Sequence, residues 1–109
     1  MATKSNLVID QGSTYSVVLD LTDENGDVID LIGYTANSQI RKWYTSSTPA
    51  ATFTTSINAS SGELQLSLTA NQTSNLVAGR YVYDVELDQG GVISRIVEGI
   101  ITVTPQVTK

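Results

Sequence analysis

The sequence predicts an all-β domain, a β-sandwich of about seven or eight short strands with one short helical turn. First, apolar and polar residues alternate in segment after segment, with the period of two that a half-buried strand requires. Second, turn signals built from Gly, Asn and Asp separate these segments at intervals of roughly 8 to 12 residues. Third, Ser, Thr and β-branched residues are abundant, whereas strong helix formers are nowhere concentrated. The 109 residues suffice for one domain with one core.

The first half of the chain is expected to contain four strands. These are residues 7–10, 14–22, 28–31 and 34–43. The alternation is most regular in the second of them, where Tyr15, Val17 and Leu19 share one face. Asn25-Gly26 lies between two apolar segments and predicts a tight hairpin turn, because both central residues of such a turn need positive φ.

The second half is expected to contain four more strands and the helical turn. The strands are residues 51–57, 63–68, 80–88 and 92–103. Thr69 with Gln72 three residues later has the form of a capping box, which predicts a short helix over 69–76. In the last strand Ile93 and Val97 are predicted to face inward together. Gly99 in the same strand indicates a bulge or a close backbone neighbour.

The stretch 76–87 is predicted to form the centre of the fold. One face of its strand is apolar and is expected to form the structural core; it consists of Tyr81, Tyr83, Val85 and Leu87. The strand spacing is typical of an immunoglobulin-like antiparallel sandwich, with a small closed barrel as the alternative. In that fold Tyr81 has the position of a tyrosine corner, whose hydroxyl bonds back to the preceding loop. Alternatively, Tyr81 and Tyr83 are simply large core residues.

The domain is expected to extend over residues 6–105. Residues 1–5 are predicted to be a flexible N-terminal lead-in and 106–109 a C-terminal tail. The N-terminus lacks the apolar core of a signal peptide, so we expect synthesis in a cytoplasm.

The composition argues against several classes of function. The chain has no Cys and no His, which removes the commonest catalytic bases and transition-metal ligands, so we expect no enzymatic activity and no cofactor. A net charge of −5, with 6 scattered basic residues, argues against a nucleic-acid partner. No apolar run is long enough to cross a bilayer, so no membrane partner is expected.

One motif has the spacing of a calcium loop. Asp23, Asn25 and Asp27 follow the Asp-x-Asn-x-Asp pattern of oxygen ligands. Val28 and Leu31 stand where a complete loop would have Gly and a further ligand, and Asn25-Gly26 already accounts for a turn. We therefore predict a hairpin turn here, with a weak divalent-cation site as the alternative.

The candidate interaction surface is the run Arg41, Lys42, Trp43 and Tyr44. It joins the one adjacent basic pair to the one Trp of the chain, and exposed aromatic residues beside Arg are typical of interface hot spots. Alternatively, Trp43 caps the core at the end of a sheet. The alternative function is an adhesion or carbohydrate-binding module that uses Trp43 and Tyr44.

Several segments together resemble a known family. They are DLTDENG at 20–26, IGYTA at 32–36, SGELQLSLT at 61–69, LVAGRYVYDV at 76–85 and EGIITVTP at 98–105. In these segments the chain resembles small immunoglobulin-like virion proteins of tailed bacteriophages, and is similar to the N-terminal domain of phage upper baseplate proteins.

This resemblance implies a structural protein without enzymatic activity that docks into a symmetric particle. The expected location is the virion, in the tail, baseplate or neck first and in capsid decoration second. The expected partners are other virion proteins, with a second copy of this chain as a further candidate. The shared segments are structural, so no functional residue is transferred by the resemblance.

Overall fold

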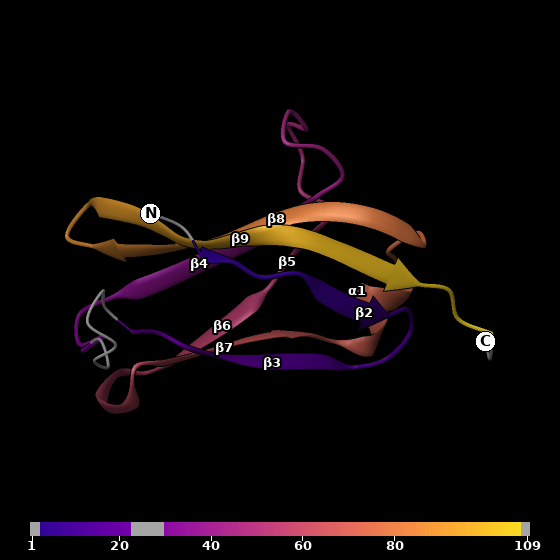
Figure 1. The fold of residues 1–109 in the computed structure, drawn as a ribbon. Helices are drawn as coiled ribbons and strands as arrows, with labels where there is room; N and C mark the ends of the chain where they lie inside the picture. Colours follow the sequence, from indigo (N-terminus) through magenta and orange to yellow (C-terminus); the bar gives the residue numbers. More distant parts are fainter. Residues whose placement is uncertain (1–2, 23–29, 108–109) are drawn as a thin grey trace.

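Two β-sheets lie face to face (Figure 1). The apolar side chains of the core lie between them. The structure is a computed structural model, and it describes residues 3–22 and 30–107. Sheet A has the strand order β1-β9-β8-β4-β5, with β2 also paired to β9, and sheet B has the order β3-β7-β6. The predicted β-sandwich is confirmed.

Sheet A is built on the two longest strands of the described residues. β8 (Gly79–Gln89) and β9 (Val92–Thr104) form a hairpin, and β4 (Thr35–Arg41) pairs with the other side of β8. The short β5 (Ala51–Thr52) follows β4 at one edge. At the other edge β1 (Thr3–Lys4) and β2 (Leu7–Asp10) both run parallel to β9, so the sandwich is not purely antiparallel.

Sheet B is narrower. Its strands are β3 (Tyr15–Asp20), β7 (Glu63–Leu68) and β6 (Thr54–Asn58), and all pairings are antiparallel. The expected strand over 51–57 is in fact two strands, because the chain passes from sheet A to sheet B at Phe53. The Phe53 side chain is buried between the sheets, where it contacts the rings of Tyr15 and Tyr83.

Two short helical segments connect these strands. The 3-10 helix η1 (Ala59–Ser61) joins β6 to β7. The helix α1 (Ala70–Ser74) begins at Thr69, whose side chain accepts a hydrogen bond from the Gln72 backbone while the Gln72 side chain bonds back to Thr69. The predicted capping box is confirmed, and it explains how a helix of five residues forms at all.

The core is lined by the inward faces of both sheets. The four side chains predicted from β8, Tyr81, Tyr83, Val85 and Leu87, are all buried. They face Leu64, Leu66 and Leu68 of sheet B, which are buried as well. The Tyr81 hydroxyl donates a hydrogen bond to the Val77 carbonyl oxygen over 2.7 Å, so the predicted tyrosine corner is confirmed.

Two expectations need a correction or a different limit, and the structure decides between the two alternatives for Gly99. Ile93 is exposed, because a bulge between β8 and β9 leaves Ile96 as an extra residue and reverses the faces beyond it. Gly99 is not the bulge but has a close backbone neighbour, the carbonyl group of Ser5. Thr3–Lys4 pairs with β9, so the paired chain begins before the expected boundary at residue 6. The hairpin turn predicted at Asn25-Gly26 lies outside the described residues.

Candidate functional site

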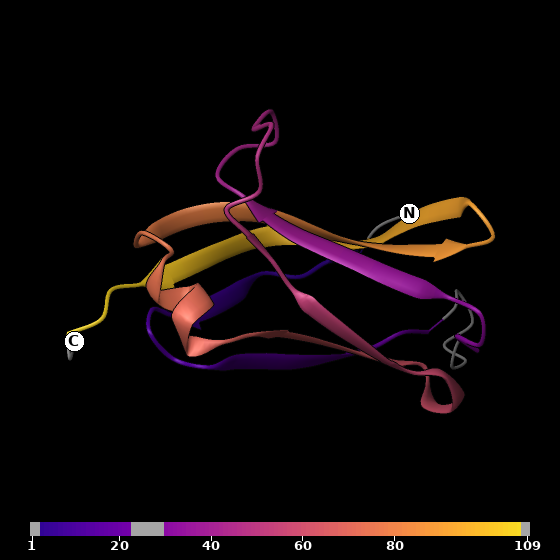
Figure 2. The same ribbon diagram turned by 180° about the vertical axis from the view of Figure 1, so that it is seen from behind.

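The most prominent departure from the sandwich is the loop 42–50, between β4 and β5. It rises from the body of the molecule in two opposite views (Figures 1 and 2). Its base is closed by a hydrogen bond from the Ala50 backbone to the Ile40 carbonyl oxygen, 2.6 Å long. Nearer its tip, the Ser46 backbone donates to the Trp43 carbonyl oxygen over 3.1 Å. The Ser46 hydroxyl in turn accepts from the Trp43 backbone over 3.2 Å, so hydrogen bonds hold the loop in a defined shape.

The loop exposes two aromatic side chains. Trp43 is 65% exposed and Tyr44 is 76% exposed. Burying a large aromatic ring is one of the main sources of folding free energy. Both residues leave most of their surface exposed here, so they contribute little of it. Trp43 therefore does not cap the core, and the surface-exposed alternative is the one that the fold adopts.

The Lys42 side chain fixes the position of the loop on sheet A. Its ammonium group donates a hydrogen bond to the Arg80 carbonyl oxygen over 2.8 Å. The same nitrogen lies 4.8 Å from the centroid of the Tyr81 ring and 5.6 Å from that of Trp43. Both distances allow a cation–π interaction, which contributes on the order of 0.5 to 1 kcal/mol at an exposed site.

Beside the loop lies a mostly apolar depression of about 360 Å³, here called the aromatic hollow. Val82 and Ile100 lie opposite each other on β8 and β9 and face outward from sheet A. Trp43 and Tyr44 come from the loop, and the charged side chains beside them are Lys42 and Arg80. An acidic protein thus has a locally basic and aromatic surface.

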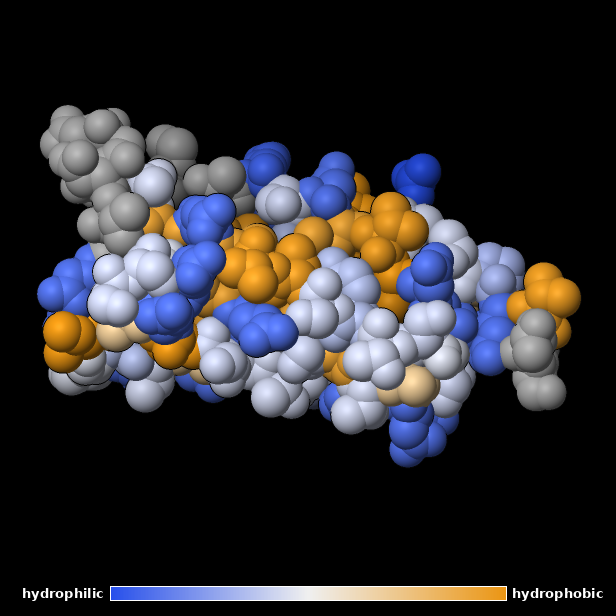
Figure 3. Space-filling view, turned by 90° about the horizontal axis from the view of Figure 1, so that it is seen from below, coloured by the Kyte–Doolittle hydropathy of each residue, from blue (hydrophilic) through white to orange (hydrophobic). Residues whose placement is uncertain are grey.

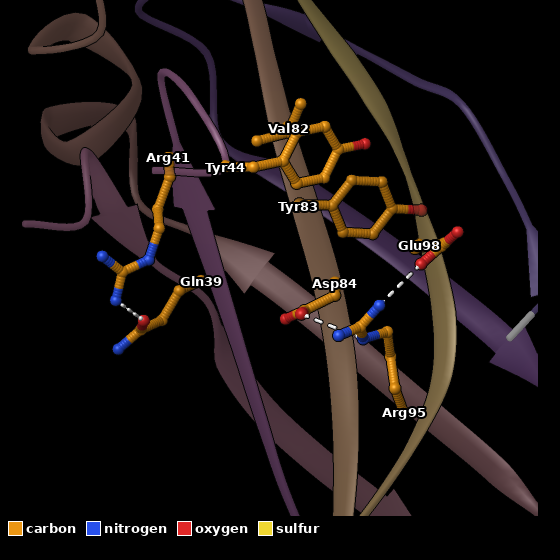
Figure 4. A pocket seen from close by; sticks show the side chains of 8 residues that line it. All are labelled: Gln39, Arg41, Tyr44, Val82, Tyr83, Asp84, Arg95 and Glu98. Atoms are coloured by element: carbon orange, nitrogen blue, oxygen red, sulfur yellow. Dashed lines mark hydrogen bonds and ion pairs between the residues drawn. The ribbon is translucent and has the colours of Figure 1, made fainter. Parts of the chain in front are cut away.

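A second depression of about 310 Å³, here called the polar hollow, lies beside Tyr44 on the same face of sheet A (Figure 4). Gln39 and Arg41 come from β4, and Asp84 comes from β8. Arg95 and Glu98 come from β9. The pairings of Gln39 with Asp84 and of Asp84 with Glu98 bring these three side chains into one row across the sheet.

The polar hollow is organised by Arg95. Its guanidinium group lies 3.1 Å from a Glu98 carboxylate oxygen and 3.5 Å from an Asp84 oxygen (Figure 4). The hydrogen bond to Glu98 and the nearby Asp84 charge raise the pKa of Arg95 further above its ordinary value, so it stays charged. On β4, Arg41 donates to the Gln39 side chain over 2.8 Å and to the Ser46 carbonyl oxygen. The hollow therefore presents an amide and charges of both signs beside an aromatic ring.

The structure distributes the four predicted interaction residues over both hollows. Lys42 and Trp43 belong to the aromatic hollow, Arg41 to the polar hollow, and Tyr44 to both. Other members of the site lie outside the predicted run. They are Gln39, Arg80, Val82, Asp84, Arg95, Glu98 and Ile100. Within each strand, the alternation of residues predicts that most of these side chains face outward. That alternation does not show which strands are neighbours in the sheet.

The calcium-like motif gains no support. Asp23, Asn25 and Asp27 lie outside the described residues. Within residues 3–22 and 30–107, no three Asp or Glu side chains are placed so that they could hold a metal ion. The same ranges contain no helix with the length and hydrophobicity needed to cross a membrane.

Comparison with known proteins supports the fold. No protein-family model and no curated protein sequence matches the chain. Among solved structures, the chain is similar to Listeria monocytogenes InlP, with a TM-score of 0.54 and 17% sequence identity. The similarity extends over 94% of this chain and 28% of the InlP chain. At this identity the similarity concerns the β-sandwich alone.

Proposed function

We propose that this protein is a non-enzymatic structural protein of a tailed-bacteriophage virion, which docks into a symmetric assembly through the aromatic hollow. The observation that carries the docking proposal is the exposure of Trp43 and Tyr44 on a hydrogen-bonded loop above an apolar patch of sheet. Ordered aromatic side chains with apolar neighbours are typical of interface hot spots, because they bury a large area at little cost in conformational entropy.

The charges around the hollow indicate the chemistry of the partner. Three of the 6 basic residues, Arg41, Lys42 and Arg80, lie in or beside it, although the chain carries a net charge of −5. An apolar segment flanked by acidic side chains would complement this surface. Another virion protein is the proposed source of that segment, in the tail, baseplate or neck first and in capsid decoration second.

The virion part of the proposal rests on the sequence segments that resemble phage proteins. Mass spectrometry of particles purified from cultures that express the gene in its native genome tests it. We expect the protein at a fixed ratio to the major virion proteins. Absence from purified particles would overturn the virion role, whatever the hollow binds.

The docking part is tested with variants of the loop. Trp43→Ala should reduce the amount of protein on purified particles at least tenfold, since hot-spot substitutions cost about 2 kcal/mol or more. Val92→Ala is the matched control, because Val92 is similarly exposed but lies at the far tip of the β8–β9 hairpin. Equal incorporation of both variants would contradict docking through the hollow.

A second candidate function is that of a carbohydrate-binding module. The observation that favours it is the polar hollow, where an amide, guanidinium groups and carboxylates lie beside the Tyr44 ring. Sites of this kind combine an apolar or aromatic wall with a few orienting polar groups. Glycan-array binding that is lost in Tyr44→Ala would support it. An array without any signal for the wild type would count against it.

A further inference from the structure

Strand β3 forms an open edge of sheet B. Within residues 3–22 and 30–107 it pairs only with β7. The hydrogen bond from the Leu21 backbone to the Gly62 carbonyl oxygen shows which residues of β3 bond to β7. Because antiparallel strands alternate between bonded and non-bonded positions, Tyr15, Val17 and Leu19 bond to β7. The backbone groups of Ser16, Val18 and Asp20 therefore point to the open side, where none bonds to another described segment.

The inward side chains along this edge are only partly covered. The inward side chains of β3, Tyr15, Val17 and Leu19, are only half-buried, whereas Leu64, Leu66 and Leu68 of neighbouring β7 are fully buried. On the outer face Val18 is 51% exposed. The view of this side of the molecule shows apolar surface gathered along its middle between polar margins (Figure 3). A further strand beside β3 would cover both the backbone groups and the half-buried side chains.

β3 has little of the usual protection of an edge strand. Natural edges are blocked by charged residues, above all Lys, by Pro or by bulges. β3 contains no Lys and no Pro, pairs with β7 without interruption, and carries one charged residue, Asp20, at its end. At the opposite edge of sheet B, two hydrogen bonds join the start of β6 to β4. The Phe53 backbone donates to the Ser38 carbonyl oxygen over 3.0 Å and the Thr55 hydroxyl to that of Ala36 over 3.1 Å. In sheet A the edge strand β5 has only two residues.

We propose that two copies of this chain join through their β3 strands, antiparallel and related by a two-fold axis at Val18. Opposed residues in a sheet must share a face, and the free backbone groups are those of Ser16, Val18 and Asp20. The axis at Val18 pairs Val18 with itself and Ser16 with Asp20 of the second copy. These three opposed pairs would form six backbone hydrogen bonds, two in each pair.

The side chains of β3 complement themselves in this register. On the inner face Val17 meets Leu19 of the second copy, so that the half-buried apolar residues cover one another. On the outer face Asp20 meets the Ser16 hydroxyl, and no two carboxylates are directly opposed. A second copy of β3 thus presents matching side chains to this edge on both faces. For this reason we propose a second copy as the occupant, rather than a terminal segment or an unrelated strand.

The expected dimer is weak and reversible. Stable interfaces bury roughly 1,200 to 2,000 Å², more than one pair of six-residue strands provides. We therefore expect a dimer that forms at about 100 µM and above. The proposal does not depend on the virion role, because it concerns the protein alone in solution.

Single cysteines test the register, since the natural chain has none. Val18→Cys places two thiols opposite each other on the axis, where the Cα separation of about 5.5 Å allows a disulfide. Ser16→Cys is the matched control, because its two copies are offset by four residues, or about 13 Å. Under mild oxidation we expect disulfide-linked dimers at least tenfold faster for Val18→Cys. Equal rates would overturn the proposed axis.

Light scattering over a concentration series tests the edge itself. Val18→Lys places two like charges directly opposite each other across the proposed axis. Val18→Pro removes the backbone N–H that points to the open side of β3 and does not bond to β7. Both variants should remain monomeric at 1 mM, roughly tenfold above the midpoint expected for the wild type. Val8→Lys, at an exposed position of sheet A, should dimerise as the wild type does. A monomeric wild type at this concentration, or a dimer that persists in both Val18 variants, would overturn the proposal.

Discussion

The hydroxyl of Tyr83 donates a hydrogen bond to the backbone carbonyl of Ser5, 2.6 Å away. This bond connects the buried centre of β8 to the N-terminal segment, across 78 residues of sequence. Gly99 of β9, which pairs with Tyr83, makes room for it, because a Cβ at Gly99 would collide with the Ser5 carbonyl group. The Tyr83 hydroxyl thus holds the N-terminal segment to the sheet, and the lack of a side chain at Gly99 allows the segment to lie this close.

Gly99→Ala should destabilise the protein by about 1 to 3 kcal/mol, as overpacking of a close contact usually does. The added methyl group would push Ser5 away from β9 and break its bond to Tyr83. Urea denaturation gives the free energy of unfolding. In a chain shortened by residues 1–5 the same substitution should cost much less, and an equal cost in both backgrounds would show that the Ser5 contact is not the cause.

Tyr81→Phe should cost about 1 kcal/mol, because it removes only the hydrogen bond to the Val77 carbonyl oxygen. Tyr81→Ala should cost about 3 to 5 kcal/mol, since it also empties a buried site. In thermal unfolding, the melting temperature should be highest for the wild type, lower for Tyr81→Phe and lowest for Tyr81→Ala. An unchanged melting temperature for Tyr81→Ala would refute the tyrosine corner.

Thr73→Val should cost about 1 to 3 kcal/mol although it conserves the side-chain volume. The buried Thr73 hydroxyl accepts from the Gly12 backbone over 3.0 Å and donates to the Ser13 carbonyl oxygen over 2.8 Å. These bonds join α1 to the turn between β2 and β3, and valine leaves the Gly12 donor unpaired. Ser74→Ala is the exposed control in the same helix and should change the free energy of unfolding by less than about 0.5 kcal/mol.

The protein should lose stability as the pH rises above about 10. Burial raises the pKa of Tyr15, Tyr81 and Tyr83 above the ordinary value of 10.0. In this range the unfolded chain releases protons that the folded chain retains, so alkali favours unfolding, and the loss continues until the raised pKa values are passed. Urea midpoints at pH 8, 10 and 11 measure the effect. Tyr83→Phe should lose less stability than the wild type between pH 8 and 11, and an identical loss would exclude Tyr83 as a contributor.

Local pattern explains the parts of the fold that the sequence predicted well. In β8 the alternation alone separates the buried Tyr81, Tyr83, Val85 and Leu87 from their mostly polar neighbours. In α1 the capping box fixes the start of the helix from two residues, Thr69 and Gln72. Both signals succeed because the interactions that produce them lie within one element.

The bulge opposite β8 shows where local pattern fails. Ile93 and Val97 have the same parity in sequence, but the extra residue Ile96 turns Ile93 to the outer face. No residue near Ile96 in the sequence predicts the bulge, because the bulge depends on how β9 pairs with β8. The same holds for the passage between sheets at Phe53 and for the parallel pairing of Thr3–Lys4 with β9.

By itself, the sequence determined the class of fold, most of the strands, the core of β8, the capping box of α1 and two aromatic residues beside a basic pair. Only the tertiary structure decided that Trp43 and Tyr44 lie on the surface, that Arg95 joins Asp84 and Glu98 beside Tyr44, and that β3 has an open edge. The reason is physical. The alternation of residues within a strand predicts which of its side chains are buried. The neighbours of that strand depend on long-range pairing, which cannot be predicted from the residues of the strand alone.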